Sequence, residues 1–119
     1  MPTLAGTQDV LDLISPQIAD AFQSSAAIIE RHLTKAERDV VAETRRDWVD
    51  SYVSVNDNVK ETLRTATANK TAMELTNKYK AFEFSRAAAI TSLNVFHNEM
   101  SRAIRVLSDL DTTDIRGVN

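Results

Sequence analysis

The histidines are the side chains with the widest range of chemistry here, and the sequence has two, His32 and His97. Neither follows a glutamate by three residues, because Ile29 and Asn94 occupy those positions. Di-iron bundles use Glu-x-x-His pairs, so that kind of centre is not indicated. His97 precedes Met100 by three residues, and these two types can ligate haem iron. The alternative is a histidine hydrogen-bonded at the edge of a helical core, and we expect this second role.

Nucleophilic catalysis would need a serine activated by a histidine that a third group orients, and two isolated histidines give little material for it. The carboxylates form small groups typical of solvated faces or helix caps: Asp9 and Asp12, Asp47 and Asp50, and Asp109, Asp111 and Asp114. The sequence has no phosphate-binding or dinucleotide-binding glycine pattern and no zinc signature. We therefore expect a protein that is not an enzyme and uses no cofactor.

The charge balance of the 119-residue chain is slightly acidic, with a formal net charge of −3. Nucleic-acid binding draws on concentrated basic surface, whereas the basic residues here are scattered, so we expect no nucleic-acid partner. The chain has no cysteine, which fits a reducing compartment. No cationic segment precedes an apolar run at the start, and no apolar run approaches the ~20 residues that span a bilayer. We expect a cytoplasmic protein without a transmembrane segment.

The helix breakers of this sequence lie near its two ends, at Pro2, Gly6, Pro16 and Gly117. The residues between Pro16 and Gly117 are rich in alanine, leucine, glutamate, lysine and arginine, which predicts an all-α fold. We expect an antiparallel bundle of about three or four amphipathic helices with one long C-terminal helix. The expected organisation is a loosely ordered segment over 1–15, the bundle over 16–110, and a flexible tail over 111–119.

Helix boundaries inside this region must be inferred from capping signals. Three capping-box patterns pair an N-cap side chain with a glutamate three residues later: Thr34 with Glu37, Asn58 with Glu61, and Thr71 with Glu74. The polar segments SVNDN and TANKT add turn-forming residues. The helices expected from these signals run from about Pro16 into the thirties, onward to about Val53, from Asn58 to Ala68, and from Ala72 to about Leu107.

The last expected helix carries a seam of mostly apolar residues at alternating steps of three and four, which is typical of bundles and coiled coils. The seam consists of Leu75, Tyr79, Phe82, Ile90, Leu93, His97, Met100, Ile104 and Leu107. Arg86 also falls on it, where we expect the guanidinium to pair with an acid or to reach solvent. This face is the one we expect in the core.

A second apolar line runs along the opposite side of the same expected helix. Phe84, Val95 and Val106 recur every eleven residues, close to three full turns, with Ala88 and Leu110 near them. Trp48 and Tyr52 form a further apolar cluster. These residues either pack on a helix of this bundle or of a second protomer, or they stay available for an apolar ligand, a granule or a membrane interface.

The order of these features resembles the phasins, small helical proteins that coat polyhydroxyalkanoate granules. An amphipathic stretch, ERDVVAETRRDWVDS, is followed by a polar interruption and by AMELTNKYKAFEFSRAA. The most similar run extends from Ala72 through Tyr79 to Glu83, and the likeness covers roughly residues 37–109. The resemblance implies a non-enzymatic coat protein that covers a polyester surface, self-associates through helices and has no catalytic residues.

Two other functions remain open from the sequence. One is a helical adaptor or oligomerisation module of a larger assembly, with both apolar faces of the last helix buried in protein. The other is a haem or metal-binding bundle that uses His97. The expected partners are a second copy or another helical protein, with a polyester granule or other apolar surface as the further candidate.

Overall fold

The computed structural model describes residues 3–14, 26–79 and 86–109, and within these ranges it contains helices and no strand. The predicted all-α class is confirmed. The elements are α1 (Thr7–Leu11), α3 (Ala26–Thr44), α4 (Trp48–Ser51), the 3-10 turn η1 (Tyr52–Ser54), α5 (Asp57–Tyr79) and α6 (Arg86–Asp109). Each helix in this part of the chain is too short or too polar to cross a bilayer.

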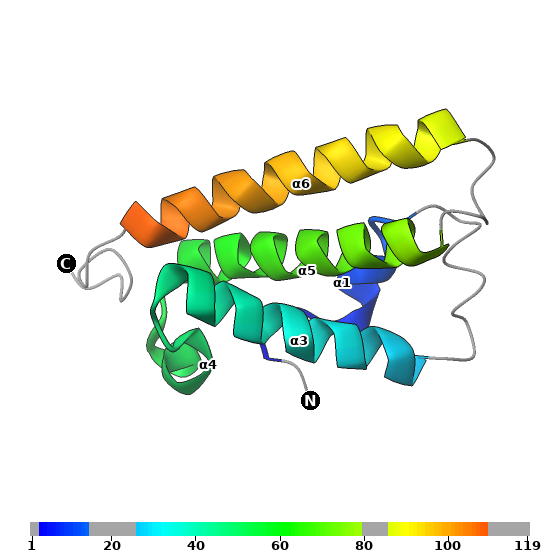
Figure 1. Cartoon of the computed structure of the whole chain (residues 1–119). Coiled ribbons are helices and arrows are strands. Elements are labelled where there is room, and N and C mark those ends of the chain that lie inside the picture. Colours follow the sequence, from blue (N-terminus) through cyan, green and yellow to red (C-terminus); the bar gives the residue numbers. More distant parts are fainter. Residues whose placement is uncertain (1–2, 15–25, 80–85, 110–119) are drawn as a thin grey trace.

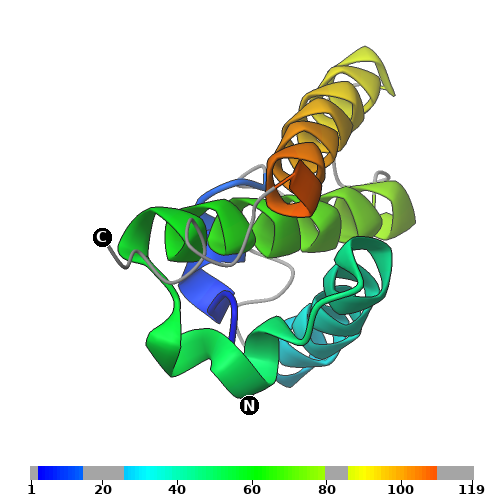
Figure 2. The ribbon, with the colours of Figure 1, turned by 90° about the vertical axis from the view of Figure 1, so that its left-hand side faces the viewer.

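Helix α5 is the central element, with α3 on one side of it and α6 on the other (Figure 1). The three long helices run in alternating directions, and α1 also packs against α5 and α3 (Figures 1 and 2). Because α5 has neighbours on several sides, small or polar residues such as Ala66, Thr67, Ala68 and Asn69 are all buried. Over this stretch α5 lacks the polar outer face of a surface helix, which it does show closer to its start, at Glu61 and Arg64.

Two apolar clusters form the core, one toward each end of α5. The first joins α1, α3, α5 and α6 through Ala5, Val10, Ile14, Ile29, Leu33, Ala68, Ala72, Leu75 and Phe96. The second joins the N-terminal segment to α3, α4, α5 and α6 through Leu4, Val40, Trp48, Val55, Val59, Leu63, Ala66, Ala103 and Leu107. Both clusters contain residues from four or more segments, so they hold the described parts together as one bundle.

The prediction of one helix from Ala72 to Leu107 is wrong. Residues 72–79 belong to α5, and residues 86–107 belong to α6, which lies beside α5 and runs in the opposite direction (Figure 1). The predicted short helix from Asn58 to Ala68 is wrong for the same reason, since α5 continues without a break to Tyr79. The C-terminal half of the bundle is therefore a pair of helices of similar length.

The segment TANKT does not end a helix because its polar side chains bond within one. Asn69 Nδ2 donates to the carbonyl of Thr65 at 2.8 Å, and Thr71 Oγ1 donates to the carbonyl of Thr67 at 2.9 Å. Such bonds to the carbonyl four residues back satisfy the side chain without breaking the helix. Thr71 is thus an interior helix residue and not the predicted N-cap.

The other two capping-box predictions have different outcomes. Thr34 lies inside α3, where its Oγ1 donates to the carbonyl of Glu30 at 2.9 Å, so the predicted helix start there is wrong. The start predicted at Asn58 is close to the observed one, because α5 begins at Asp57. The capping side chain is Asn56, whose Oδ1 accepts from the Asn58 amide at 2.8 Å.

Residues 3–14 correct the expectation of a loosely ordered N-terminal segment. The Glu37 carboxylate of α3 accepts from the backbone amides of Thr3 and Leu4, the latter at 3.0 Å. Leu4 and Val10 are almost fully buried in the two clusters. The position at the chain end suggested loose order, but these apolar side chains have partners far along the chain. The predicted tail over 111–119 and the predicted helix start at Pro16 lie outside the described residues.

Helix α3 ends at Thr44, and Arg45 follows it with a φ of 59°, in the left-handed region that closes helices. The predicted continuation toward Val53 is instead made by α4 and η1. Asp47 caps α4, since its Oδ1 accepts from the Asp50 amide at 3.2 Å. This change of direction brings Trp48 back into the core.

Candidate interaction surface

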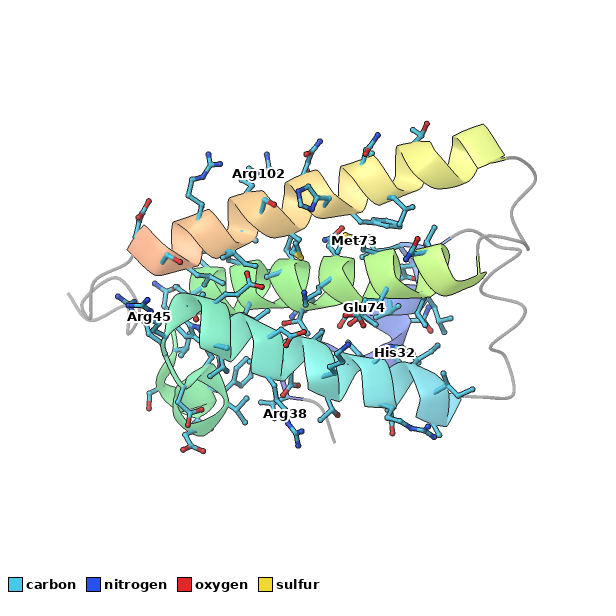
Figure 3. The ribbon with its side chains drawn as sticks, viewed as in Figure 1. His32, Arg38, Arg45, Met73, Glu74 and Arg102 are labelled. Atoms are coloured by element: carbon cyan, nitrogen blue, oxygen red, sulfur yellow. The ribbon has the colours of Figure 1, made fainter. Side chains whose placement is uncertain are left out.

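One exposed flank of α6, which we call its outward face, carries Val95, Glu99, Arg102 and Val106, at steps of four, three and four residues. Its last three residues also line a hollow of about 240 Å³ beside Glu61, Thr62 and Thr65 of α5. Residues at this spacing lie in one line along a helix. Val95 is 52% exposed and Val106 is 45% exposed. Between them Arg102 Nη2 donates to Glu99 Oε2 at 2.6 Å, and Figure 3 shows Arg102 pointing away from the bundle. The line is therefore apolar at both ends and charged in the middle.

These two valines belong to the predicted second apolar line. Both are exposed, so within the described residues this line is not covered by another helix. Phe84 and Leu110 lie outside the described residues, and the side chain of Ala88 does too. The charged pair inside the line was not anticipated, although the spacing of Glu99 and Arg102 was readable in the sequence.

The inward face of α6 consists of Leu93, Phe96, Met100, Ala103 and Leu107, again at steps of three and four. Phe96 packs into the first core cluster, and Ala103 and Leu107 pack into the second. The predicted seam included Leu93, Met100 and Leu107 but missed Phe96, which is only 5% exposed. The signal that could have found it is size, because Phe96 is the largest apolar side chain in this half of the helix.

The predicted seam is wrong at His97, because the side chain of this residue is exposed. The observed face is rotated toward Phe96, which leaves His97 at the edge of the α5–α6 contact, and Ile104 is half-buried. Leu75, another predicted seam residue, is fully buried but lies on α5. Tyr79, Phe82, Arg86 and Ile90 have side chains outside the described set.

A shallow groove of about 350 Å³ lies beside His97, between the antiparallel helices α5 and α6. The side chains that line it are Met73, Glu74, Asn77, Leu93, Asn94 and His97. Met100 is buried, whereas His97 faces this groove and the solvent, so the two do not converge on one ligand. In the described part of the chain, no group of three or more histidine or carboxylate side chains is placed to hold a metal ion.

Trp48, one of the candidate residues for the apolar interaction face, is 1% exposed. Its Nε1 donates to Thr44 Oγ1 at 2.7 Å, and that hydroxyl donates to the Val40 carbonyl at 2.8 Å. A buried indole requires such an acceptor for its N–H. Tyr52 is half-buried with the Lys60 ammonium 4.9 Å from its ring centre. Of the two alternatives left open for Trp48, packing within the bundle is the one observed, because the turn after α3 directs it inward.

Polar links join α3 and α5: Lys70 Nζ lies 3.7 Å from Asp39 Oδ2, and His32 meets Glu74. His32 Nδ1 lies 3.3 Å from Glu74 Oε2, and both side chains are about four-fifths buried. Lys35 Nζ approaches the other carboxylate oxygen at 3.9 Å but is largely exposed. Figure 3 shows His32 and Glu74 facing one another between the two helices. This histidine serves the packing of the bundle, a role that was expected for His97 and not for His32.

A hollow of about 610 Å³ runs along α3. Its described lining is Ala27, Glu30, Arg31, His32, Thr34, Lys35 and Arg38. Arg31, Lys35 and Arg38 fall on one helix face at steps of four and three residues, and all three are exposed. Figure 3 shows Arg38 pointing away from the bundle. The hollow is positively charged overall and can attract anions, with Glu30 as the opposing charge.

The electrostatics at the start of α4 involve two neighbouring acids. A side-chain hydrogen bond with Asp47 raises the pKa of Asp50, and the negative charge of Asp47 raises it further. Like charges in proximity disfavour joint ionisation. The group is fully exposed, so this pair marks local repulsion on the surface and not a catalytic dyad in a cleft.

Comparison of the chain with protein-family models, curated proteins and solved structures found no match.

Proposed function

We propose that this protein acts by presenting helical surfaces to other molecules, without catalysing a reaction, and that its main contact surface is the outward face of α6. The observation that carries the proposal is the exposed line of Val95, Glu99, Arg102 and Val106. Charged groups across a protein interface are arranged to meet opposite charges, which gives specificity, and the valines add apolar contact area. The absence of cysteine supports action in a reducing compartment such as the cytoplasm.

A protein partner suits this face better than a uniformly apolar surface. An apolar surface pressed against α6 would remove Glu99 and Arg102 from water and offer them no hydrogen bonds, which is costly for charged groups. A protein can supply opposite charges and apolar pockets at the same spacing. The adaptor or oligomerisation module is therefore the function that the geometry supports best.

The phasin-like coat remains the second candidate. Its support is a scatter of exposed apolar side chains, of which Val53 on η1 is 91% exposed and Val49 on α4 is 37% exposed. Together with Val95 and Val106 they give the surface several points at which an apolar granule could be touched. Their separation over different elements makes each contact small.

The test compares the intact protein with Val95→Ser/Val106→Ser, and uses Val53→Ser as the matched control on another element. Binding to polyhydroxybutyrate particles and to hydrophilic beads is measured, together with the sedimentation of each protein over a range of concentrations. The adaptor function predicts association that the double variant loses and the control keeps. Preferential polyester binding lost in Val53→Ser would support the coat function. The proposed surface would be refuted if the intact protein neither associates nor binds polyester.

A further inference from the structure

The outward face of α6 presents complementary chemistry when its direction is reversed. In chain order the line is Val95, Glu99, Arg102 and Val106, with steps of four, three and four residues. The reversed line has the same steps and reads valine, arginine, glutamate, valine. Two such lines placed side by side in antiparallel directions therefore set valine against valine and each charge against its opposite.

We propose that two copies of this chain form a dimer through this face, with their α6 helices antiparallel. The two-fold axis passes between Glu99 and Arg102. The inference rests on the proposed function, because it names the partner that the α6 surface takes. Such an interface is isologous, since the same patch is used by both copies.

The contacts follow from the register that the symmetry fixes. Val95 of each copy packs on Val106 of the other, and Glu99 of each copy faces Arg102 of the other. The spacing of four, three and four is that of a helix–helix seam, so the two valine pairs and the two charged pairs form one continuous contact. Adding about 1.5 Å per residue, the line extends about 16 Å along the helix.

The charges select the antiparallel arrangement over the parallel one. A parallel pair in register would place Glu99 beside Glu99 and Arg102 beside Arg102, and like charges repel. In the antiparallel pair the four charges alternate in sign, and the 2.6 Å contact within each copy already holds both side chains on the outward face. The side chain of Arg102 is 70% exposed and that of Glu99 is 38% exposed, so both are accessible to a second copy.

The bundle can form this contact without rearrangement. Helix α6 packs on α5 through Phe96, Met100, Ala103 and Leu107, which point about 100° around the helix from the outward face. In Figures 1 and 2 α6 lies at the edge of the described bundle. The outward face borders Glu61, Thr62 and Thr65 of α5, so a second copy seated on it also approaches this edge of α5. The contact is small, so we expect a weak dimer, with a dissociation constant on the order of micromolar.

The experiment measures self-association by sedimentation equilibrium for the full chain and for charge-reversed variants. We expect Glu99→Arg and Arg102→Glu each to weaken dimerisation at least about tenfold, which corresponds to about 1.4 kcal/mol. An equimolar mixture of the two variants should recover the association, because each copy then meets opposite charges. The doubly reversed Glu99→Arg/Arg102→Glu protein should recover it alone. Arg38→Glu, on the outward face of α3, is the control and should associate as the intact protein does.

Circular dichroism checks that each variant keeps its helices. Association that is unchanged in both single variants, or a mixture that fails to recover it, would overturn the antiparallel α6 dimer. In either case, a Val95→Ser/Val106→Ser variant that no longer self-associates would show that the α6 surface is used and that only the antiparallel register is wrong. An intact protein that stays monomeric at about 100 μM, which is about 100-fold above the expected dissociation constant, would also overturn the dimer. Binding of the α6 face to another molecule is read separately by the particle assay.

Discussion

Glu74 on α5 and His32 on α3 meet across the interface of their helices, with 3.3 Å between Oε2 and Nδ1. The two residues are 42 positions apart in the sequence, and the contact lies at the edge of the first core cluster, next to Leu33 and Leu75 in the sequence. Because both side chains are about four-fifths buried, solvent screens this contact less than it screens a surface ion pair.

We expect Glu74→Gln to lower the free energy of unfolding by about 1 kcal/mol, since a partly buried, charge-assisted hydrogen bond is weakened. The control is Glu61→Gln, which breaks a shorter contact, 2.6 Å to Arg64, at an exposed site on the same helix. Exposed pairs contribute about 0 to 1 kcal/mol, so the control should lose less. Urea denaturation measures both, and a larger loss in the control would contradict the ranking.

The register of α6 predicts different costs for two neighbouring apolar residues. Phe96 is 5% exposed and lies in the first core cluster, whereas Leu93 is half-buried at the groove beside His97. We expect Phe96→Ala to cost about 3 to 5 kcal/mol and Leu93→Ala to cost less than 2. Denaturant unfolding of both variants measures the difference. Equal losses, or a larger loss at Leu93, would restore the seam predicted from the sequence.

That seam illustrates how far periodicity determines a helix face. Steps of three and four fit both the predicted set containing His97 and Ile104 and the observed set containing Phe96 and Ala103. The two faces share Leu93, Met100 and Leu107, so the pattern located the correct side of the helix to within one residue. Which set is buried depends on the rotation of α6 on α5, and that is a tertiary property.

The helix boundaries show a similar limit. Scarcity of glycine and proline correctly predicted an all-α chain, but it left the positions of the breaks to weak polar signals. TANKT was read as a break because threonine and asparagine compete with the helical backbone for hydrogen bonds. In the bundle Asn69 and Thr71 direct those bonds to carbonyls of their own helix. The surrounding helices enclose α5, and that enclosure could not be read locally.

The Trp48 site predicts a cost for a change that preserves side-chain shape. Thr44→Val removes the hydroxyl that accepts the indole N–H at 2.7 Å, and Trp48 is 1% exposed. A buried donor without an acceptor costs about 1 to 3 kcal/mol, and we expect a loss in that range. Val53→Ser, at a side chain that is 91% exposed, should have almost no effect. Since Trp48 is the only tryptophan, its fluorescence follows the unfolding of all three proteins directly.

The acids at the start of α4 predict a pH dependence. The hydrogen bond with Asp47 and the charge of Asp47 raise the folded-state pKa of Asp50 above 3.8, so the folded state holds this proton more tightly. Stability is therefore fully present below about pH 3.8 and falls as pH rises through the folded-state pKa. Asp50→Asn cannot ionise and should melt at a higher temperature than the intact protein at neutral pH. The two melting temperatures should converge toward about pH 3, and a variant that melts lower at neutral pH would contradict the sign.

The buried threonines of α5 predict effects of opposite sign for the same substitution. Thr67 Oγ1 is buried and has no hydrogen-bond partner among the described residues, whereas Thr71 Oγ1, four residues later, donates to the Thr67 carbonyl at 2.9 Å. Both side chains are fully buried, so Thr→Val changes only the polarity of one branch. Thr67→Val replaces an unpaired hydroxyl with a methyl group and should raise the free energy of unfolding by up to about 1 kcal/mol. Thr71→Val removes a hydrogen bond and should lower it by about 0.5 to 1 kcal/mol. Urea denaturation measures both, and a loss at Thr67 as large as that at Thr71 would mean that the Thr67 hydroxyl has a partner in solution.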